Sequence, residues 1–314
     1  PVMHKHGVVC GLLLAFASHA GGQSTRDSIA VTIDASKSGA TIDRNIFGQC
    51  AEHLGSGIYE GVWVGPDSSI PNTRGIRNDV VAALKALKVP NVRWPGGCFA
   101  HGYHWRKGIG AAGQRTATLN PNWGGVTEPN TFGTHEFMDF VGQIGSRAYL
   151  SINVGSGTPR EAAEWLEYVT AAQPTTLASQ RAANGHPAPY AVDYLGIGNE
   201  SWDCGGNMTP ERYLDQLKSY ARFVRNFNPA QQQDSNRMLK IAVGPGGDGP
   251  RWTEWTDTIM KAWQGRSWSW DFDALSLHNY TVVKWPPAYT STGFGETEYA
   301  QILKSTLEID RIIS

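Results

Sequence analysis

The chain has 314 residues, of which 40% are hydrophobic and 18% are charged, and its formal net charge is −1. This length is enough for one large domain with a sizeable core. The near-neutral charge, without a long run of one sign, argues against nucleic acid or an anionic membrane surface as a partner.

The first twenty residues have the features of an export signal. Lys5 lies in a short polar start, and an apolar stretch follows over residues 8–17. This stretch is too short to span a membrane, and Ser18 and Ala20 are small residues with the spacing of a cleavage site. We therefore predict a signal peptide over residues 1–20 and a secreted or periplasmic protein that is not embedded in a membrane.

Short apolar runs alternate with stretches of helical period along the rest of the chain. Residues 21–44 are predicted to form an N-terminal segment, with a strand at 29–33 that lies outside the main domain. Residues 45–314 contain six predicted strands, each followed by a loop and a helix. The strands are predicted at 45–49, 91–94, 148–154, 191–198, 239–243 and 272–277, and the helices at 77–88, 134–144, from 158, from 209, near 252–263 and at 298–313.

Repeated strand–helix units predict an α/β fold with a parallel sheet and helices outside it. A doubly wound sheet and a (β/α)₈ TIM barrel both fit this pattern. No GxGxxG or P-loop follows the first strand, which argues against a nucleotide-binding sheet. The long loops 51–76 and 95–133 are typical of barrels, which hold their sites in such loops. We therefore predict an incomplete TIM barrel over residues 45–314, with about six of the eight units.

Polar residues follow the ends of four predicted strands. In a barrel these ends meet at one mouth, where barrel enzymes hold their active sites. The sequence therefore predicts one site built from these side chains. They are Glu52 and His53 at the first strand, Arg93 and Cys98 at the second, Asn199 and Glu200 at the fourth, and His278 and Tyr280 at the sixth.

Glu200 is the leading candidate for chemistry among them. Its neighbour Trp202 would partly desolvate the carboxyl group, which favours the uncharged form. A general acid needs that form to protonate a glycosidic oxygen. The alternative is an N-capping or surface carboxylate, and position alone leaves both open.

The other polar residues at the strand ends also have two interpretations each. Glu52 could be a second carboxylate of the site, or an ion-pair partner of Arg93 that also accepts hydrogen bonds. Asn199 could bind a sugar hydroxyl, His278 could be a base, a donor or a structural residue, and Tyr280 could donate to a carboxylate or simply pack. The sequence has no HExxH or CxxC spacing, so we predict no metal and no cofactor.

Three cysteines remain once Cys10 is assigned to the signal peptide. They are Cys50, Cys98 and Cys204. One disulfide with one free thiol and three partly buried thiols both fit this number.

Several ordered motifs resemble glycoside hydrolase family 51. The resemblance runs from about residue 29 to the end of the chain, and the combination is specific although each motif alone is weak. The motifs are FGxxAEHLG at 47–55, RWPGG at 93–97, YHW at 103–105, NVGSG at 153–157, GNE at 198–200 and LHxY at 277–280.

The resemblance implies a retaining α-L-arabinofuranosidase of clan A with a TIM barrel followed by a β-sandwich. It implies that Glu200 is the acid/base and that Asn199 holds the sugar 2-hydroxyl. It places Glu52 and Arg93 in the arabinose pocket and Tyr280 near the nucleophile. Cys98 stands where other members have Asn or Cys, and with His278 it completes the predicted substrate-binding set.

The family nucleophile is a glutamate at the tip of the seventh strand. Six strands are predicted here, so no residue of this chain matches it, and the closing strands and the sandwich are also missing. The 314-residue chain alone is therefore expected to have little or no activity.

We predict an exo-acting enzyme that removes arabinofuranosyl groups from arabinoxylan, arabinan or their oligosaccharides, and whose complete form could be a homo-oligomer. One alternative is another clan A glycosidase, such as an endo-xylanase or endo-glucanase. A second alternative is a non-catalytic sugar-binding protein.

Overall fold

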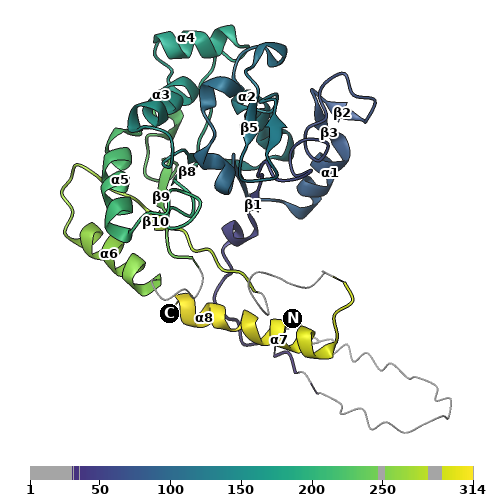
Figure 1. Ribbon diagram of the computed structural model, residues 1–314, viewed down its shortest axis with the longest axis vertical. Helices are drawn as coiled ribbons and strands as arrows, with labels where there is room; N and C mark the ends of the chain where they lie inside the picture. Colours follow the sequence, from purple (N-terminus) through teal and green to yellow (C-terminus); the bar gives the residue numbers. More distant parts are fainter. Residues whose placement is uncertain (1–29, 31, 35, 247–251, 282–291, 314) are drawn as a thin grey trace, which may run out of the picture. The chain divides into compact units, whose positions relative to one another are not determined.

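The computed structural model describes residues 30, 32–34, 36–246, 252–281 and 292–313 (Figure 1). The chain divides into two units, Pro1–Ile42 and Asp43–Ser314. The predicted signal peptide at residues 1–20 lies outside the described residues. The predicted strand at 29–33 is not seen in its described part, since residues 30, 32 and 33 have no ladder partner and Ile33 is 88% exposed. In the described part of the chain, no helix is both long enough and apolar enough to cross a bilayer.

The second unit is built on a parallel sheet that has six strands among the described residues. The strands pair in chain order, β1-β4-β7-β8-β9-β10, which is the arrangement of an incomplete (β/α)₈ barrel, as predicted. Every residue of β8 is buried, as expected for a parallel strand that is covered on both faces. The bounds are β1 Gln49–Cys50, β4 Asn91–Trp94, β7 Arg147–Ile152, β8 Tyr194–Ile197, β9 Leu239–Ala242 and β10 Ala274–Leu275.

Helices follow the strands and pack on one another around the sheet: α1 contacts α2, α3 contacts α5, and α5 contacts α6. Figure 1 shows α3, α5 and α6 along the outer side of β8, β9 and β10. Two helices begin as the sequence predicts, with the Thr158 and Thr209 side chains accepting backbone N–H groups and a proline in the first turn. The bounds are α1 Asn78–Leu87, α2 Thr134–Ile144, α3 Pro159–Thr170, α4 Thr176–Ala183, α5 Pro210–Phe223, α6 Trp252–Gln264, α7 Glu296–Thr306 and α8 Glu308–Ile313.

The largest differences from the predicted elements of residues 45–314 are at three places. The strand at 45–49 is wrong over most of its length, because Asp43 caps a short 3₁₀ helix, η1 (Arg44–Phe47), and β1 starts only at Gln49. The predicted strand at 272–277 pairs only at β10. The predicted helix at 298–313 is interrupted at Leu307, between α7 and α8.

Helix α4 and two hairpins are among the elements that the sequence did not predict. Helix α4 begins at a Thr175 cap, a local signal that could have indicated it. Two antiparallel hairpins occupy the long loops that follow β1 and β4. They are β2–β3 (Asn72–Thr73 with Ile76–Arg77) and β5–β6 (Thr118–Asn120 with Val126–Glu128).

An aromatic cluster fills the core beneath the carboxyl ends of β1 and β4. Trp94 is fully buried and stacks on Phe137 with ring centroids 5.1 Å apart, and Trp165 contacts its edge. Large buried rings of this kind contribute strongly to core stability. They fix the end of β4, the strand that carries Arg93 and leads into the Cys98 loop.

The stability of this fold is expected to depend on pH through His135 of α2. Burial lowers the pKa of His135 to about 4, and the ring nitrogens contact the hydroxyls of Tyr190 and Tyr168 at 2.7 and 2.6 Å. The unfolded chain therefore binds this proton first as pH falls. Stability is then lost between the ordinary histidine pKa near 6.5 and the folded value, by about 2 kcal/mol between pH 7 and pH 5.

The His135→Gln variant tests this expectation. Urea unfolding at pH 7 and pH 5 should show a smaller difference in unfolding free energy for the variant than for the wild type. Equal pH dependence of the two proteins would contradict the assignment. The lost tyrosine contacts lower stability at both pH values, so they do not affect this comparison.

Candidate active site

The loops after β4, β8 and β10 bring three predicted site residues into contact. Glu200 is the third residue after the end of β8, and its side chain is 14% exposed. His278 Nδ1 lies 2.6 Å from Glu200 Oε1. The sulfur of Cys98 lies 3.8 Å from Glu200 Oε2. The carboxyl group of Glu200 is therefore partly buried between a histidine and a sulfur atom.

The backbone holds Glu200 in a tight turn. Its φ of 37° lies in the left-handed region, which costs free energy for a residue with a side chain. The carbonyl of Glu200 accepts hydrogen bonds from the N–H groups of Asp203 and Gly205 at 2.9 and 3.0 Å. This turn ends the run of β8 and directs the carboxyl group toward the mouth residues.

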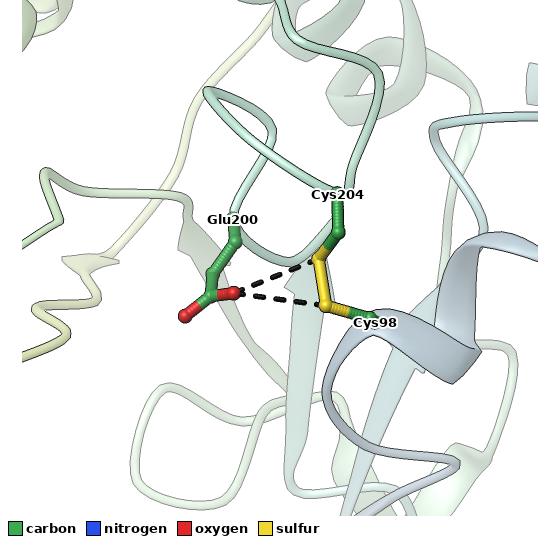
Figure 2. A group of neighbouring side chains, drawn as sticks. All are labelled: Cys98, Glu200 and Cys204. Carbon is green, nitrogen blue, oxygen red and sulfur yellow. Dashed lines mark hydrogen bonds between the residues drawn. A yellow bond between two sulfur atoms is a disulfide. The ribbon is translucent and has the colours of Figure 1, made fainter. Parts of the chain in front are cut away.

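A disulfide joins Cys98 to Cys204, with the two Cα atoms 5.6 Å apart, and Cys50 is a free, exposed thiol. The alternative of one disulfide is therefore the one observed. Figure 2 shows the Glu200 carboxyl group against this disulfide, with Oε2 3.6 Å from the Cys204 sulfur. Disulfide sulfurs carry no hydrogen, so in this state they contact Oε2 without donating to it.

Glu200 and the two cysteines of the disulfide have the composition of a soft-metal site. The ligand atoms of Cys98, Glu200 and Cys204 lie within 4.8 Å of one another. Thiolates are the ligands that such metals require. Since the two sulfurs are bonded to each other, they offer no thiolate, and the three residues cannot bind a metal through thiolates while the disulfide is formed.

Asn199 lies beside Glu200 and is 1% exposed. Its Nδ2 atom is 3.8 Å from the Cys204 sulfur, so its side chain and that of Glu200 both approach this atom. Its Oδ1 atom is buried without a hydrogen-bond partner among the described residues. A buried acceptor of this kind has unused capacity for a donor.

His101, which was not predicted as a site residue, fixes the backbone of this turn. It lies in η2 (Cys98–His101), accepts the Gly155 N–H at Nδ1 over 3.0 Å, and contacts the Asn199 carbonyl through Nε2. Burial lowers the pKa of His101. A neutral imidazole therefore links the β4 loop to the Asn199–Glu200 turn.

Glu52 is held at the mouth by the unpredicted β5–β6 hairpin. Trp123 Nε1 donates to Glu52 Oε1 at 2.8 Å, and Asn120 Nδ2 donates to the carbonyl of His53 at 2.7 Å. The Gly97 backbone lies directly against the Glu52 carboxylate, since a Cβ atom there would be 2.0 Å from Oε1. The carboxylate thus occupies a fixed place beside the turn after β4.

His53 belongs to a buried structural network. Trp94 Nε1 donates to His53 Nε2 at 3.0 Å, so the ring proton lies on Nδ1, which donates to Glu128 at 2.7 Å. Burial raises the pKa of the Glu128 carboxyl group, but hydrogen bonds from His53, Tyr59 and the Asn130 N–H outweigh it, and the net pKa is lowered. Both ring nitrogens of His53 are therefore used within the core.

Arg93 and Tyr280 are the two remaining residues of the predicted site. No ion pair within 4.0 Å joins Glu52 to Arg93 among the described residues, and Arg93 Nη2 lies 3.7 Å from the Cys50 sulfur. Tyr280 is 67% exposed. Partial burial and then the charges of Glu200 and Glu52 raise the pKa of its hydroxyl. Both carboxylates are therefore close enough to Tyr280 for their charges to affect the pKa of its hydroxyl.

Comparison with known proteins gives a consistent set of relatives. A family profile described as "Alpha-L-arabinofuranosidase 1 domain" matches residues 83–267. The "Intracellular exo-alpha-L-arabinofuranosidase" of Bacteroides ovatus is 43% identical over 95% of this chain and 56% of its own length. The "Alpha-L-arabinofuranosidase C" of Emericella nidulans is 36% identical over 66% of this chain and 41% of its own length. This chain therefore spans about half the length of the curated relatives it matches.

Two similar solved structures are also arabinofuranosidases. The GH51 arabinofuranosidase from Xanthomonas axonopodis pv. citri is 50% identical, with a TM-score of 0.81, over 89% of this chain and 54% of that one. The α-L-arabinofuranosidase from Thermotoga maritima, solved as an arabinose complex, is 40% identical with a TM-score of 0.61, over 69% of this chain and 42% of that one.

One prediction is corrected by these comparisons. The Bacteroides ovatus relative is named an intracellular enzyme, which contradicts the prediction of a secreted or periplasmic protein. The apolar stretch at residues 8–17 is a compositional signal alone, and composition over ten residues does not identify a compartment.

Proposed function

The chain belongs to the α-L-arabinofuranosidases of glycoside hydrolase family 51, and on that premise we propose that its complete protein releases terminal α-L-arabinofuranosyl groups with retention of configuration. The observation that carries this proposal is the Glu200 carboxyl group, 14% exposed at the end of β8 and held by His278 over 2.6 Å. A partly desolvated, fixed carboxyl group is what a general acid requires.

Glu200 acts first as the acid and then as the base in this proposal. His278 holds Oε1, which leaves Oε2 to carry the proton for the departing glycosidic oxygen. After the leaving group departs, the same carboxylate takes a proton from the water that attacks the arabinosyl intermediate. His278 is thus a positioning residue for Glu200.

The remaining mouth residues bind the sugar ring. Glu52 accepts hydrogen bonds from arabinose hydroxyls, since its Oε2 atom is not used by Trp123. The unpaired buried oxygen of Asn199 accepts from the 2-hydroxyl. Arg93 and Cys98 line the same pocket, and Tyr280 lies close to the charges of both carboxylates.

A double displacement needs a second carboxylate about 5–5.5 Å from the first. Glu52 is assigned to substrate binding, where Trp123 fixes it. We therefore place the nucleophile in a part of the complete protein outside the described residues.

The direct test is the product spectrum of the complete protein. We expect free arabinose from a 4-nitrophenyl α-L-arabinofuranoside and from arabinoxylan or arabinan, measured by chromatography. Cleavage of internal chain bonds without free arabinose would favour an endo-glycanase instead. Arabinose that raises the melting temperature while no substrate is turned over would favour a sugar-binding protein.

A further inference from the structure

We propose that the Cys98–Cys204 disulfide is a redox-sensitive positioning element for Glu200, and that opening it weakens the acid function of Glu200. This inference rests on the proposed function. It concerns Cys204, which the proposed catalytic and binding set does not include, and assigns Cys98 a second role beside that of a pocket residue.

The disulfide connects two loops that flank the Glu200 carboxyl group. It joins η2, after β4, to the turn after β8, across 106 residues of sequence. Cys204 is only four residues from Glu200, and the turn between them is closed by the two hydrogen bonds to the Glu200 carbonyl. The cross-link therefore anchors a turn in which Glu200 has a left-handed φ of 37°.

The sulfurs also determine what surrounds Oε2. They lie 3.6 and 3.8 Å from this oxygen and offer it no hydrogen while they are bonded to each other. After reduction the two sulfurs must move apart to non-bonded contact, and each then carries an S–H group beside the carboxylate that can donate to it. Hydrogen bonds of this kind favour the ionised form of a carboxyl group. The ionised form carries no proton, so a larger ionised fraction leaves fewer molecules that can protonate a leaving group.

The bond is accessible to small thiols, because Cys98 and Cys204 are both only partly buried. A thiolate attacks one sulfur and forms a mixed disulfide, and a second thiol releases it. The protein gains two electrons and two protons as two S–H groups, and the reagent leaves as its own disulfide. The redox conditions around the protein would thus determine whether the disulfide is formed, since reducing compartments keep cysteines as free thiols.

The test compares substrates that differ in their need for an acid. The dinitrophenyl group of an aryl arabinofuranoside leaves without being protonated. The leaving group of a methyl or oligosaccharide glycoside must be protonated by an acid. We expect dithiothreitol, and separately Cys204→Ser, to lower kcat/KM about tenfold for the poor leaving group and less than about twofold for the activated one. Reoxidation of the wild type should restore the original ratio.

A double variant, Cys98→Ser with Cys204→Ser, is the matched control for the reagent. Its rates should not respond to dithiothreitol, whereas a response would assign the effect to Cys50 and overturn the proposal. Circular dichroism and the melting temperature identify variants that fail to fold, and the reduced wild type then remains as the test.

Two results overturn the inference while the proposed function stands. One is an equal loss for both substrates, which indicates a purely structural cross-link. The other is no change in either rate after the disulfide has been shown to be open by thiol titration. If the oxidised wild type hydrolyses neither arabinofuranoside, the proposed function itself fails.

Discussion

Glu200→Gln in the complete protein is expected to lower kcat/KM for an arabinofuranosyl oligosaccharide by about a thousandfold, the middle of the range for general acid–base catalysis. Gln keeps the shape of the side chain and can still contact His278, but it has no proton to give. The loss should be much smaller for a dinitrophenyl glycoside, whose leaving group needs no acid in the first step. Steady-state kinetics with both substrates measure the difference.

Glu211→Gln is the matched control for this variant. Glu211 is an exposed carboxylate in the first turn of α5, and its substitution should leave both rates unchanged. A Glu200→Gln protein that retained wild-type activity toward the oligosaccharide would remove the acid/base assignment.

Gly97→Ala is expected to lower kcat/KM about a hundredfold, because it displaces the Glu52 carboxylate. The added Cβ would lie 2.0 to 2.1 Å from all three atoms of that carboxylate, at a φ of +49° that non-glycine residues rarely adopt. The backbone strain also costs about 1–3 kcal/mol of stability. Kinetics together with thermal melting separate the loss of function from the loss of folded protein.

Gly102→Ala is the matched control in the same loop. Its φ is −104°, and the added Cβ would meet only the Phe99 carbonyl oxygen, at 3.8 Å. We expect normal activity from it. Glu52→Gln should reproduce the loss seen with Gly97→Ala without backbone strain. Normal activity in Gly97→Ala, or in Glu52→Gln, would contradict the role of Glu52 in binding the sugar.

The elements that the sequence predicted correctly are those with local signals. Strand β4 and helix α2 have the predicted bounds, and α3 and α5 begin at their threonine caps. Caps and periodic apolar residues act over a few residues, so they can be read without knowing the fold. The short 3₁₀ helix at Arg44–Phe47 was predicted wrongly because two local signals conflict there. The Asp43 cap favours a helical turn, whereas the apolar residues after it resemble a strand.

The sequence predicted that residues after separate parallel strands would lie together at one edge, and the structure brings Glu200, His278 and Cys98 into contact there. The detailed contacts of the site were not predicted, because they join distant loops. The Glu52–Trp123 bond spans 71 residues, Glu200–His278 spans 78, and the disulfide spans 106. The path of a loop such as the β5–β6 hairpin depends on the surface beneath it, so its residues could not be placed beside Glu52 from their own sequence.

The most direct test of the acid/base role of Glu200 is chemical rescue of Glu200→Ala with azide, using an activated nitrophenyl α-L-arabinofuranoside. If Glu200 is the acid/base of a retaining enzyme, azide enters the vacated space, attacks the arabinosyl intermediate, and restores turnover with α-L-arabinofuranosyl azide as the product. Formation of the β-azide would identify Glu200 as the nucleophile. The absence of rescue in a correctly folded variant would likewise contradict the acid/base role on which the proposed function depends.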